Sequence, residues 1–189
     1  MSNIRVTYSG LIALAIKMVS VLTGLGYIII VTRILSTQEF GTWGMITSLM
    51  VYGAIFTSIP LFWLIRETAR EQKSEKTGLL SSIIWTPVGI LLYFLAVIAL
   101  APQINIDMTI LLFAIILVPV NNLQRLIATI NLGWKPQLSS YGILVTEIIK
   151  VPLALLFVYY LDFGVIGVII SLFISILSSI VFQIILARK

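Results

Sequence analysis

The sequence predicts an all-α integral membrane protein, built as a single bundle of six transmembrane helices with both termini in the cytoplasm. Of the 189 residues, 60% are hydrophobic and 10% are charged. A soluble domain carries about 25% charged residues, so this chain has too little charge to cover a water-facing surface. The apolar residues form six runs of the length that a membrane crossing needs, roughly 20 residues each. The basic residues gather on one side of these runs.

The predicted spans cover residues 9–32, 42–65, 78–101, 108–130, 138–161 and 164–187, and together they make residues 1–189 one membrane domain. The first span contains the apolar run Leu11 to Val31. This run is too long for the apolar region of a signal peptide and lacks a small-residue cleavage site, so we expect it to be retained. The second span leads into the charged segment RETAREQKSEKTG, which begins at Arg66. That segment is interpreted as a solvated extension of the helix, with a cytoplasmic partner site as the alternative.

The third span follows this charged segment, and the fourth is the weakest of the six. Its apolar part runs from Met108 to Val120 and is followed by Asn121, Asn122, Gln124 and Arg125. A re-entrant segment is therefore an alternative to a full crossing. The fifth span carries two charged residues, and the sixth is apolar throughout and closes the bundle.

The distribution of basic residues predicts the orientation. With a cytoplasmic N-terminus, the inner side receives Arg5, Arg66, Arg70, Lys73, Lys76, Arg125, Lys135, Arg188 and Lys189. The outer side receives Arg33 together with Glu39, Asp107 and Asp162. Short cytoplasmic loops are enriched in lysine and arginine, so both termini are expected in the cytoplasm of a multi-pass plasma-membrane protein.

Two residue types suggest how the helices pack and move. Four spans contain an interior proline, namely Pro60, Pro87, Pro119 and Pro152. Prolines are tolerated in membrane helices, but four in six spans favour a bundle that bends during transport. Small residues recur at helical spacing in span six (Gly167, Ser171, Ser175 and Ser178 or Ser179) and in span two (Gly41, Gly44 and Ser48). Both sets are expected to let helices approach closely.

Apart from Arg125 toward the inner end of span four, Lys17, Glu147 and Lys150 are the charged residues within the spans. At 1.5 Å per residue, Lys17 and Glu147 lie roughly 12–14 Å into the bilayer, and Lys150 lies one turn deeper. An ionised group at this depth costs about 3 kcal/mol, so the three are expected to face the bundle interior. They form either a cationic cavity for an anionic head group or a neutralising pair with a snorkelling Lys17.

Composition excludes several classes of function. The chain has no cysteine and no histidine, which removes the thiolate ligands, the commonest metal ligand and the commonest general base. We therefore expect no enzymatic activity, no metal site and no cofactor. The net charge of +5 lies at helix ends and does not form one soluble basic face, so no nucleic-acid partner is expected.

The connection between spans one and two carries the most specific motif. It reads Thr32-Arg33-Ile34-Leu35-Ser36-Thr37-Gln38-Glu39-Phe40-Gly41. This resembles the "tR-hydrophobic-hydrophobic-s-x-x-e-[FY]-G" signature of polysaccharide flippases in the multidrug/oligosaccharidyl-lipid/polysaccharide exporter superfamily. The segments NLGWKPQLSS and LDFGVIGVII resemble the family's loops on either side of span five. Gly41 is expected to permit a tight turn and a close approach of span two to a neighbouring helix. Arg33 and Glu39 are expected to pair at the outer end of the bundle. The stretch is interpreted as a structural hinge, with a charge at the mouth of a cavity as the alternative.

The resemblance implies a fold and a function. Family members, which include the MATE-like transporters, have two six-helix lobes around a central cavity and move lipid-linked sugars or drugs by alternating access. This chain resembles the N-terminal lobe alone, so a second copy or a separate second lobe is expected as partner. The drug-exporting branch often has an acidic residue on its first helix, where this chain has Lys17. A lysine favours an anionic lipid-linked glycan, with Lys17, Glu147, Lys150, Asn121, Asn122 and Arg125 as candidate cavity residues.

Two other functions remain open from the sequence. One is a non-transporting membrane scaffold or accessory subunit, and the other is a cation-coupled exporter of drugs or metabolites. Unpaired lysines within the membrane distinguish these readings, because they bind phosphate in a flippase and contribute nothing to a scaffold.

Overall fold

The computed structural model describes residues 6–70, 75–104 and 106–187, and this part of the chain is almost entirely helical. The long helices are α1 (Val6–Ile34), α2 (Thr37–Ala69), α3 (Glu75–Ile104), α5 (Leu117–Trp134), α6 (Pro136–Ala154) and α7 (Gly164–Ala187). Three short elements complete the chain: α4 (Met108–Phe113), the 3₁₀ turn η1 (Ala114–Ile116) and the π-helical turn η2 (Leu155–Tyr160). Helices α4, η1 and α5 run on from one another as one crossing.

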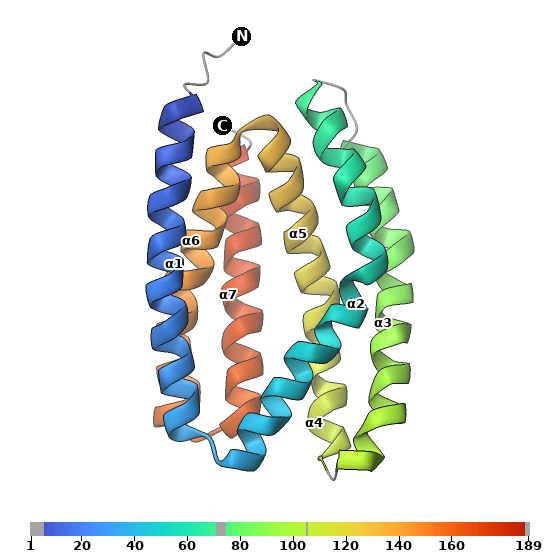
Figure 1. Cartoon of the computed structure of the whole chain (residues 1–189), viewed down its shortest axis with the longest axis vertical. Coiled ribbons are helices and arrows are strands. Elements are labelled where there is room, and N and C mark those ends of the chain that lie inside the picture. The colour runs from blue at the N-terminus through green and yellow to red at the C-terminus, as the bar shows by residue number, and fades with distance from the viewer. Residues whose placement is uncertain (1–5, 71–74, 105, 188–189) are drawn as a thin grey trace.

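Six helical segments are long and apolar enough to cross a membrane, as the sequence predicts. They are Gly10–Ile34, Thr37–Ala69, Lys76–Leu100, Met108–Trp134, Pro136–Tyr160 and Gly164–Ala187. The fourth segment is continuous, so the re-entrant alternative is wrong. The second extends through Arg66 to Ala69, which matches the expected solvated extension, whereas the residues 71–74 lie outside the described part. Figure 1 shows the start of α1 and the end of α7 at the same end of the bundle.

The prolines perturb their helices without ending them. Pro60 lies inside α2 and Pro152 inside α6, and each lacks the N–H that would bond to the carbonyl four residues earlier. The π-helical turn η2 begins three residues after Pro152, and the 3₁₀ turn η1 ends three residues before Pro119. Such local changes of hydrogen-bond register are typical beside prolines, which leave a carbonyl without its donor.

Helix α5 lies at the centre of the packing, because it contacts α2, α3, α6 and α7. Helix α2 packs along α3, and α6 packs along both α7 and α1. Helix α1 packs along α6 and not along α2, although only Leu35 and Ser36 separate α1 from α2. Figure 1 shows the result: α1 and α2 meet at one end and diverge toward the end that holds the termini.

The two halves of the bundle have different interiors. The apolar core includes Val31, Ile46, Leu49, Val165 and Val168, all in the half where α1 and α2 meet. The half toward the termini buries polar side chains, which are described below. Apolar packing therefore fills the end where α1 and α2 meet, and the two helices diverge toward the other end. The side of the bundle between the diverging α1 and α2 is called the opening between them.

Glycines decide where helices cross closely, and one expectation about them is wrong. Ser171, Ser175 and Ser179 of α7 are fully buried, as expected for the small-residue face of span six. The face of Gly41, Gly44 and Ser48 is exposed instead, and no atom lies within 4 Å of a Cβ built on either glycine. The close crossing of α2 occurs later, where a Cβ on Gly89 would collide with the carbonyl oxygen of Gly53.

Candidate functional site

An ion pair inside the membrane forms the centre of the candidate site. Glu147 and Lys150 lie one turn apart on α6, with Lys150 Nζ 2.7 Å from Glu147 Oε2. Their side chains are 11% and 14% exposed. Lysine and glutamate at this spacing lie on neighbouring positions of a helix surface, so the helix itself brings them together. The structure therefore contains the neutralising pair that the sequence offered as one of two alternatives.

Helix α1 completes the surroundings of this pair. Thr23 Oγ1 donates a hydrogen bond of 2.6 Å to Glu147 Oε2, and Lys150 Nζ lies 5.3 Å from the centroid of the Tyr27 ring. Tyr27 itself is buried, and its hydroxyl lies beside Ser171 of α7 without the geometry of a hydrogen bond. The carboxylate thus accepts bonds from two helices, and the ammonium contacts both a carboxylate and an aromatic face. This contact fixes α1 against α6.

Lys17 lies apart from this pair. Its side chain is exposed, and it lies six residues before Thr23, or about 9 Å along the helix axis. Lys17, Gly24 and Val31 are seven residues apart and so lie along one stripe of α1. Along this stripe Val31 packs in the apolar core, Gly24 is half-buried and Lys17 is exposed. Lys17 therefore lies outside the packed interior of the bundle.

The polar residues of α5 point in different directions. Asn122 is buried, accepts a 3.1 Å hydrogen bond from Thr57 of α2 and donates one of 3.2 Å to the carbonyl of Gly53. Asn121 is half-buried and Arg125 is exposed. Each residue turns a helix by about 100°, so Asn122 serves α2 while Asn121 and Arg125 lie on another face. The structure thus assigns Asn122 a packing role.

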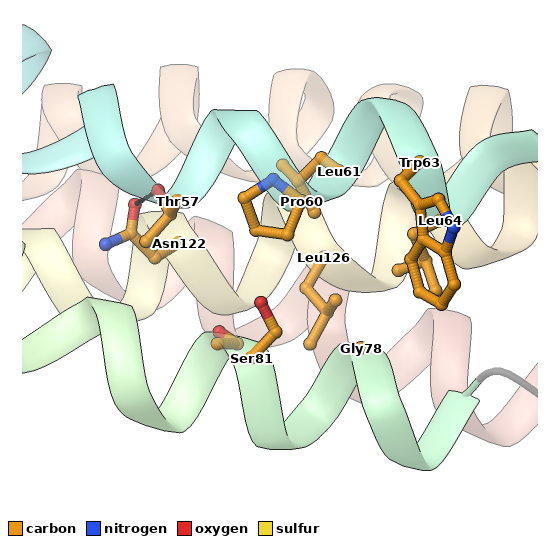
Figure 2. Close-up of a pocket in the computed structure, with 10 residues that line it drawn as sticks. Thr57, Pro60, Leu61, Trp63, Leu64, Gly78, Ser81, Asn122 and Leu126 are labelled. Atoms are coloured by element: carbon orange, nitrogen blue, oxygen red, sulfur yellow. Dashed lines mark hydrogen bonds between the residues drawn. The ribbon is translucent and has the colours of Figure 1, made fainter.

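Figure 2 shows the contact of Thr57 with Asn122 beside a small cavity below Pro60. The cavity has a volume of about 20 Å³, enough for one water molecule, and Ser81, Ser82 and Asn122 are among its lining residues. It lies where α2, α3 and α5 meet. Hydrogen-bonding groups beside a proline that lacks its own donor allow the local backbone to bend.

A second polar cluster joins α5, α6 and α7 near the terminal end. Asn131 Nδ2 donates to Gln183 Oε1 at 3.0 Å, and Gln183 Nε2 donates to Ser179 Oγ at 3.2 Å. Gln124 Nε2 reaches Thr146 Oγ1 at 3.0 Å, and Ser179 Oγ donates to the Gly142 carbonyl at 2.7 Å. Neither Asn131 nor Gln183 was expected from the sequence as a site residue. Gln183 is the single amide of an otherwise apolar span, and such a residue usually bonds to a neighbouring helix. Asn131 had no such signal, because its helix already holds Asn121, Asn122 and Gln124.

The motif between the first two spans has a different structural role from the one expected. Glu39 forms a capping box with Ser36 at the start of α2: Glu39 Oε2 accepts from Ser36 N at 2.9 Å, and Ser36 Oγ accepts from Glu39 N at 3.3 Å. No ion pair joins Arg33 and Glu39 in the described residues, because the cap already occupies the carboxylate. Gly41 lies within α2 and makes no tight turn. The turn that needs glycine is at Gly164, which has a φ of 53° and lies next to the Glu39 carboxylate.

The described part of the chain has no group of three or more acidic, histidine or cysteine side chains that could hold a metal ion. Its chemistry at the open side is that of ammonium, guanidinium, amide and hydroxyl groups, which bind phosphate and sugar oxygens. No family model matches the sequence, and neither a curated protein nor a solved structure matches the chain.

Proposed function

We propose that this chain is one lobe of a two-lobe membrane transporter, which flips a lipid-linked anionic glycan precursor by alternating access. One observation carries the proposal: Lys17, an ionisable residue deep in a membrane span, is exposed on α1, and α1 does not pack along α2. An ammonium group at this depth costs about 3 kcal/mol in contact with lipid. A partner lobe facing the opening between α1 and α2 would cover Lys17 and enclose a polar pathway.

The charges around this opening favour an anion. On α5, Leu123 and Ile127 face the groove between α3 and α7, and Arg125 lies about 200° around the helix from Leu123. Arg125 is therefore on the opposite side of α5, toward the opening. Lys150 is already paired with Glu147, so Lys17 and Arg125 supply the uncompensated positive charge. A pyrophosphate linking a sugar to a lipid carrier has the matching charge.

The partition of the interior supports alternating access. Apolar packing closes the end where α1 and α2 meet, whereas polar contacts hold the open end. Polar contacts between helices can be exchanged for contacts with substrate or water at small cost, since such bonds in membranes contribute about 0.6 kcal/mol each. In a cation-coupled exporter, by contrast, Glu147 would need to be free to bind the ion, and here Lys150 neutralises it.

The proposal is tested by reconstituting the purified chain into vesicles that contain a polyprenyl-pyrophosphate glycolipid with a fluorescent sugar. A membrane-impermeant reductant destroys the label in the outer leaflet, so flipping makes the inner label accessible. A charge-assisted bond to phosphate is worth about 1.5–3 kcal/mol, so Lys17→Gln should slow flipping by at least about tenfold. Arg70→Gln, in the exposed end of α2, is the matched control and should flip like the parent.

The mass of the particle tests the two-lobe requirement. We expect light scattering, corrected for bound detergent, to give twice the chain mass of 21.0 kDa, or more if a separately encoded lobe binds. A monomer that flips label at one copy per vesicle would overturn the requirement. A dimer that leaves the inner label protected would overturn transport in favour of a scaffold.

A further inference from the structure

A groove with a volume of about 530 Å³ lies on the side of the bundle away from the opening between α1 and α2. Its walls include Leu79 of α3, Ile127 and Trp134 of α5, and Ile184 and Ala187 of α7. Helices α3 and α7 do not pack together in the described part of the chain, so the groove between them is open along α5. Because these helices are long and apolar enough to span a membrane, we expect lipid to border the groove along its length, from the hydrocarbon to the head groups.

The base of the groove is polar, unlike an ordinary lipid-facing surface. Asn131 and Gln183 line it, are 3% and 1% exposed, and bond to each other at 3.0 Å. Gln183 continues to Ser179, which fixes the orientation of both amides. The two amides are almost inaccessible and are bonded within the protein, so they make the base of the groove polar without offering a direct contact to a ligand. A base of this kind is compatible with the ester and glycerol region of a lipid.

Basic side chains lie at the terminal end of the groove. Lys135 Nζ is 4.2 Å from the centroid of the Trp134 ring, which places an ammonium group directly beside the groove wall. Lys76 is exposed one turn before Leu79. No carboxylate lines the groove among the described residues, and the nearby Glu67 of α2 is paired with Arg70 instead. Tryptophan and lysine at the end of a span are typical of the depth of lipid head groups.

From this arrangement we propose that the groove is a binding site for one anionic phospholipid of the leaflet at the terminal end. One acyl chain lies along Ile127 and Ile184, the glycerol ester region lies toward the terminal end of the groove, and Lys135 binds the phosphate. An exposed lysine at an anionic membrane surface favours an anionic lipid over a zwitterionic one by about fivefold. The site is separate from the proposed transport pathway, because Arg125 and Leu123 lie on opposite sides of α5.

Trp134 provides the readout, since brominated acyl chains quench tryptophan fluorescence on contact. The full chain is reconstituted into vesicles of phosphatidylcholine with increasing fractions of brominated phosphatidylglycerol or brominated phosphatidylcholine. The quenching lost in Trp134→Phe is assigned to the groove, which separates it from Trp43, Trp63 and Trp85. We expect Trp134 to report a relative binding constant of about five in favour of phosphatidylglycerol.

Two variants test the geometry of the site. Lys135→Gln should lower the relative binding constant for phosphatidylglycerol over phosphatidylcholine to about one, while quenching by both lipids persists. Arg33→Gln, at the other end of the bundle, is the control and should leave this relative constant unchanged. Ala187→Phe fills the groove and should reduce quenching by both lipids, whereas Val181→Phe, exposed on α7 outside the groove, should not. Equal quenching by the two lipids in the parent chain would show ordinary boundary lipid only and would overturn the proposal. An unchanged preference in Lys135→Gln would overturn the role of that residue.

Discussion

Replacing Lys150 with methionine removes the ammonium group that lies 2.7 Å from the Glu147 carboxylate and leaves the shape of the side chain almost unchanged. Glu147 would keep its bond from Thr23 but lose its counter-charge while remaining only 11% exposed. Breaking a buried ion pair by removing one partner costs about 3–5 kcal/mol, because the other charge is left uncompensated. We expect Lys150→Met to lower the free energy of unfolding by about this amount.

The double variant Glu147→Gln/Lys150→Met separates the value of the pair from the penalty of a stranded charge. Replacing both members of a buried pair is often neutral, so the double variant should recover most of the loss. The assay is unfolding in mixed micelles of mild detergent and dodecyl sulfate, followed by circular dichroism of the helices. Arg33→Met, exposed at the far end of α1, is the control and should change stability by less than about 0.5 kcal/mol. If the single and double variants were equally unstable, the reasoning from an uncompensated carboxylate would be refuted.

Three further predictions follow from the packing and topology. Gly89→Ala should lower the free energy of unfolding by more than about 2 kcal/mol in the same assay, because its Cβ meets a backbone carbonyl of α2. Gly41→Ala should be neutral or stabilising by up to about 1 kcal/mol. Equal losses in the two variants would contradict the assigned crossing point. Gln183→Leu should lower the free energy of unfolding by about 1–2 kcal/mol, since it removes one hydrogen bond to Asn131 of α5 and one to Ser179 within α7. An unchanged unfolding curve would argue against the α5–α7 cluster. In this cysteine-free chain, a cysteine at Thr37 should be labelled from outside intact cells and one at Lys76 should not; the reverse pattern would invert the predicted orientation.

Local sequence signals identified the helices well for a physical reason. A membrane span requires an uninterrupted apolar length, and that length is a property of neighbouring residues. The charged end of α2 beyond Arg66 and the polar part of the fourth crossing do not follow from this rule, and the structure shows that both are helical. The pair of Glu147 and Lys150 was also accessible, because three residues along a helix bring side chains together whatever the tertiary structure.

The candidate site was less accessible, because its contacts join residues far apart in the chain. Thr23 and Glu147 are 124 residues apart, and Asn131 and Gln183 are 52 apart. Helical periodicity fixes which residues share a face but not which helix that face meets. For this reason Lys17 was expected in the bundle interior with Glu147 but is exposed on α1. Asn122 was expected to line a cavity but packs against α2, where it bonds to Thr57.

The amino-acid sequence is enough to predict a membrane protein of six helices and the charged residues within them, and it offers the intrahelical ion pair as one of two arrangements. Those properties follow from composition and from spacing along one helix. The tertiary structure alone shows that α1 diverges from α2 and packs on α6. It also shows that Gly53 and Gly89 make the close crossing, whereas Gly41 does not. In the same way, it shows that Glu39 caps a helix instead of pairing with Arg33. Each of these is a competition between alternative partners for one side chain or one backbone surface, and the packing of distant helices settles it.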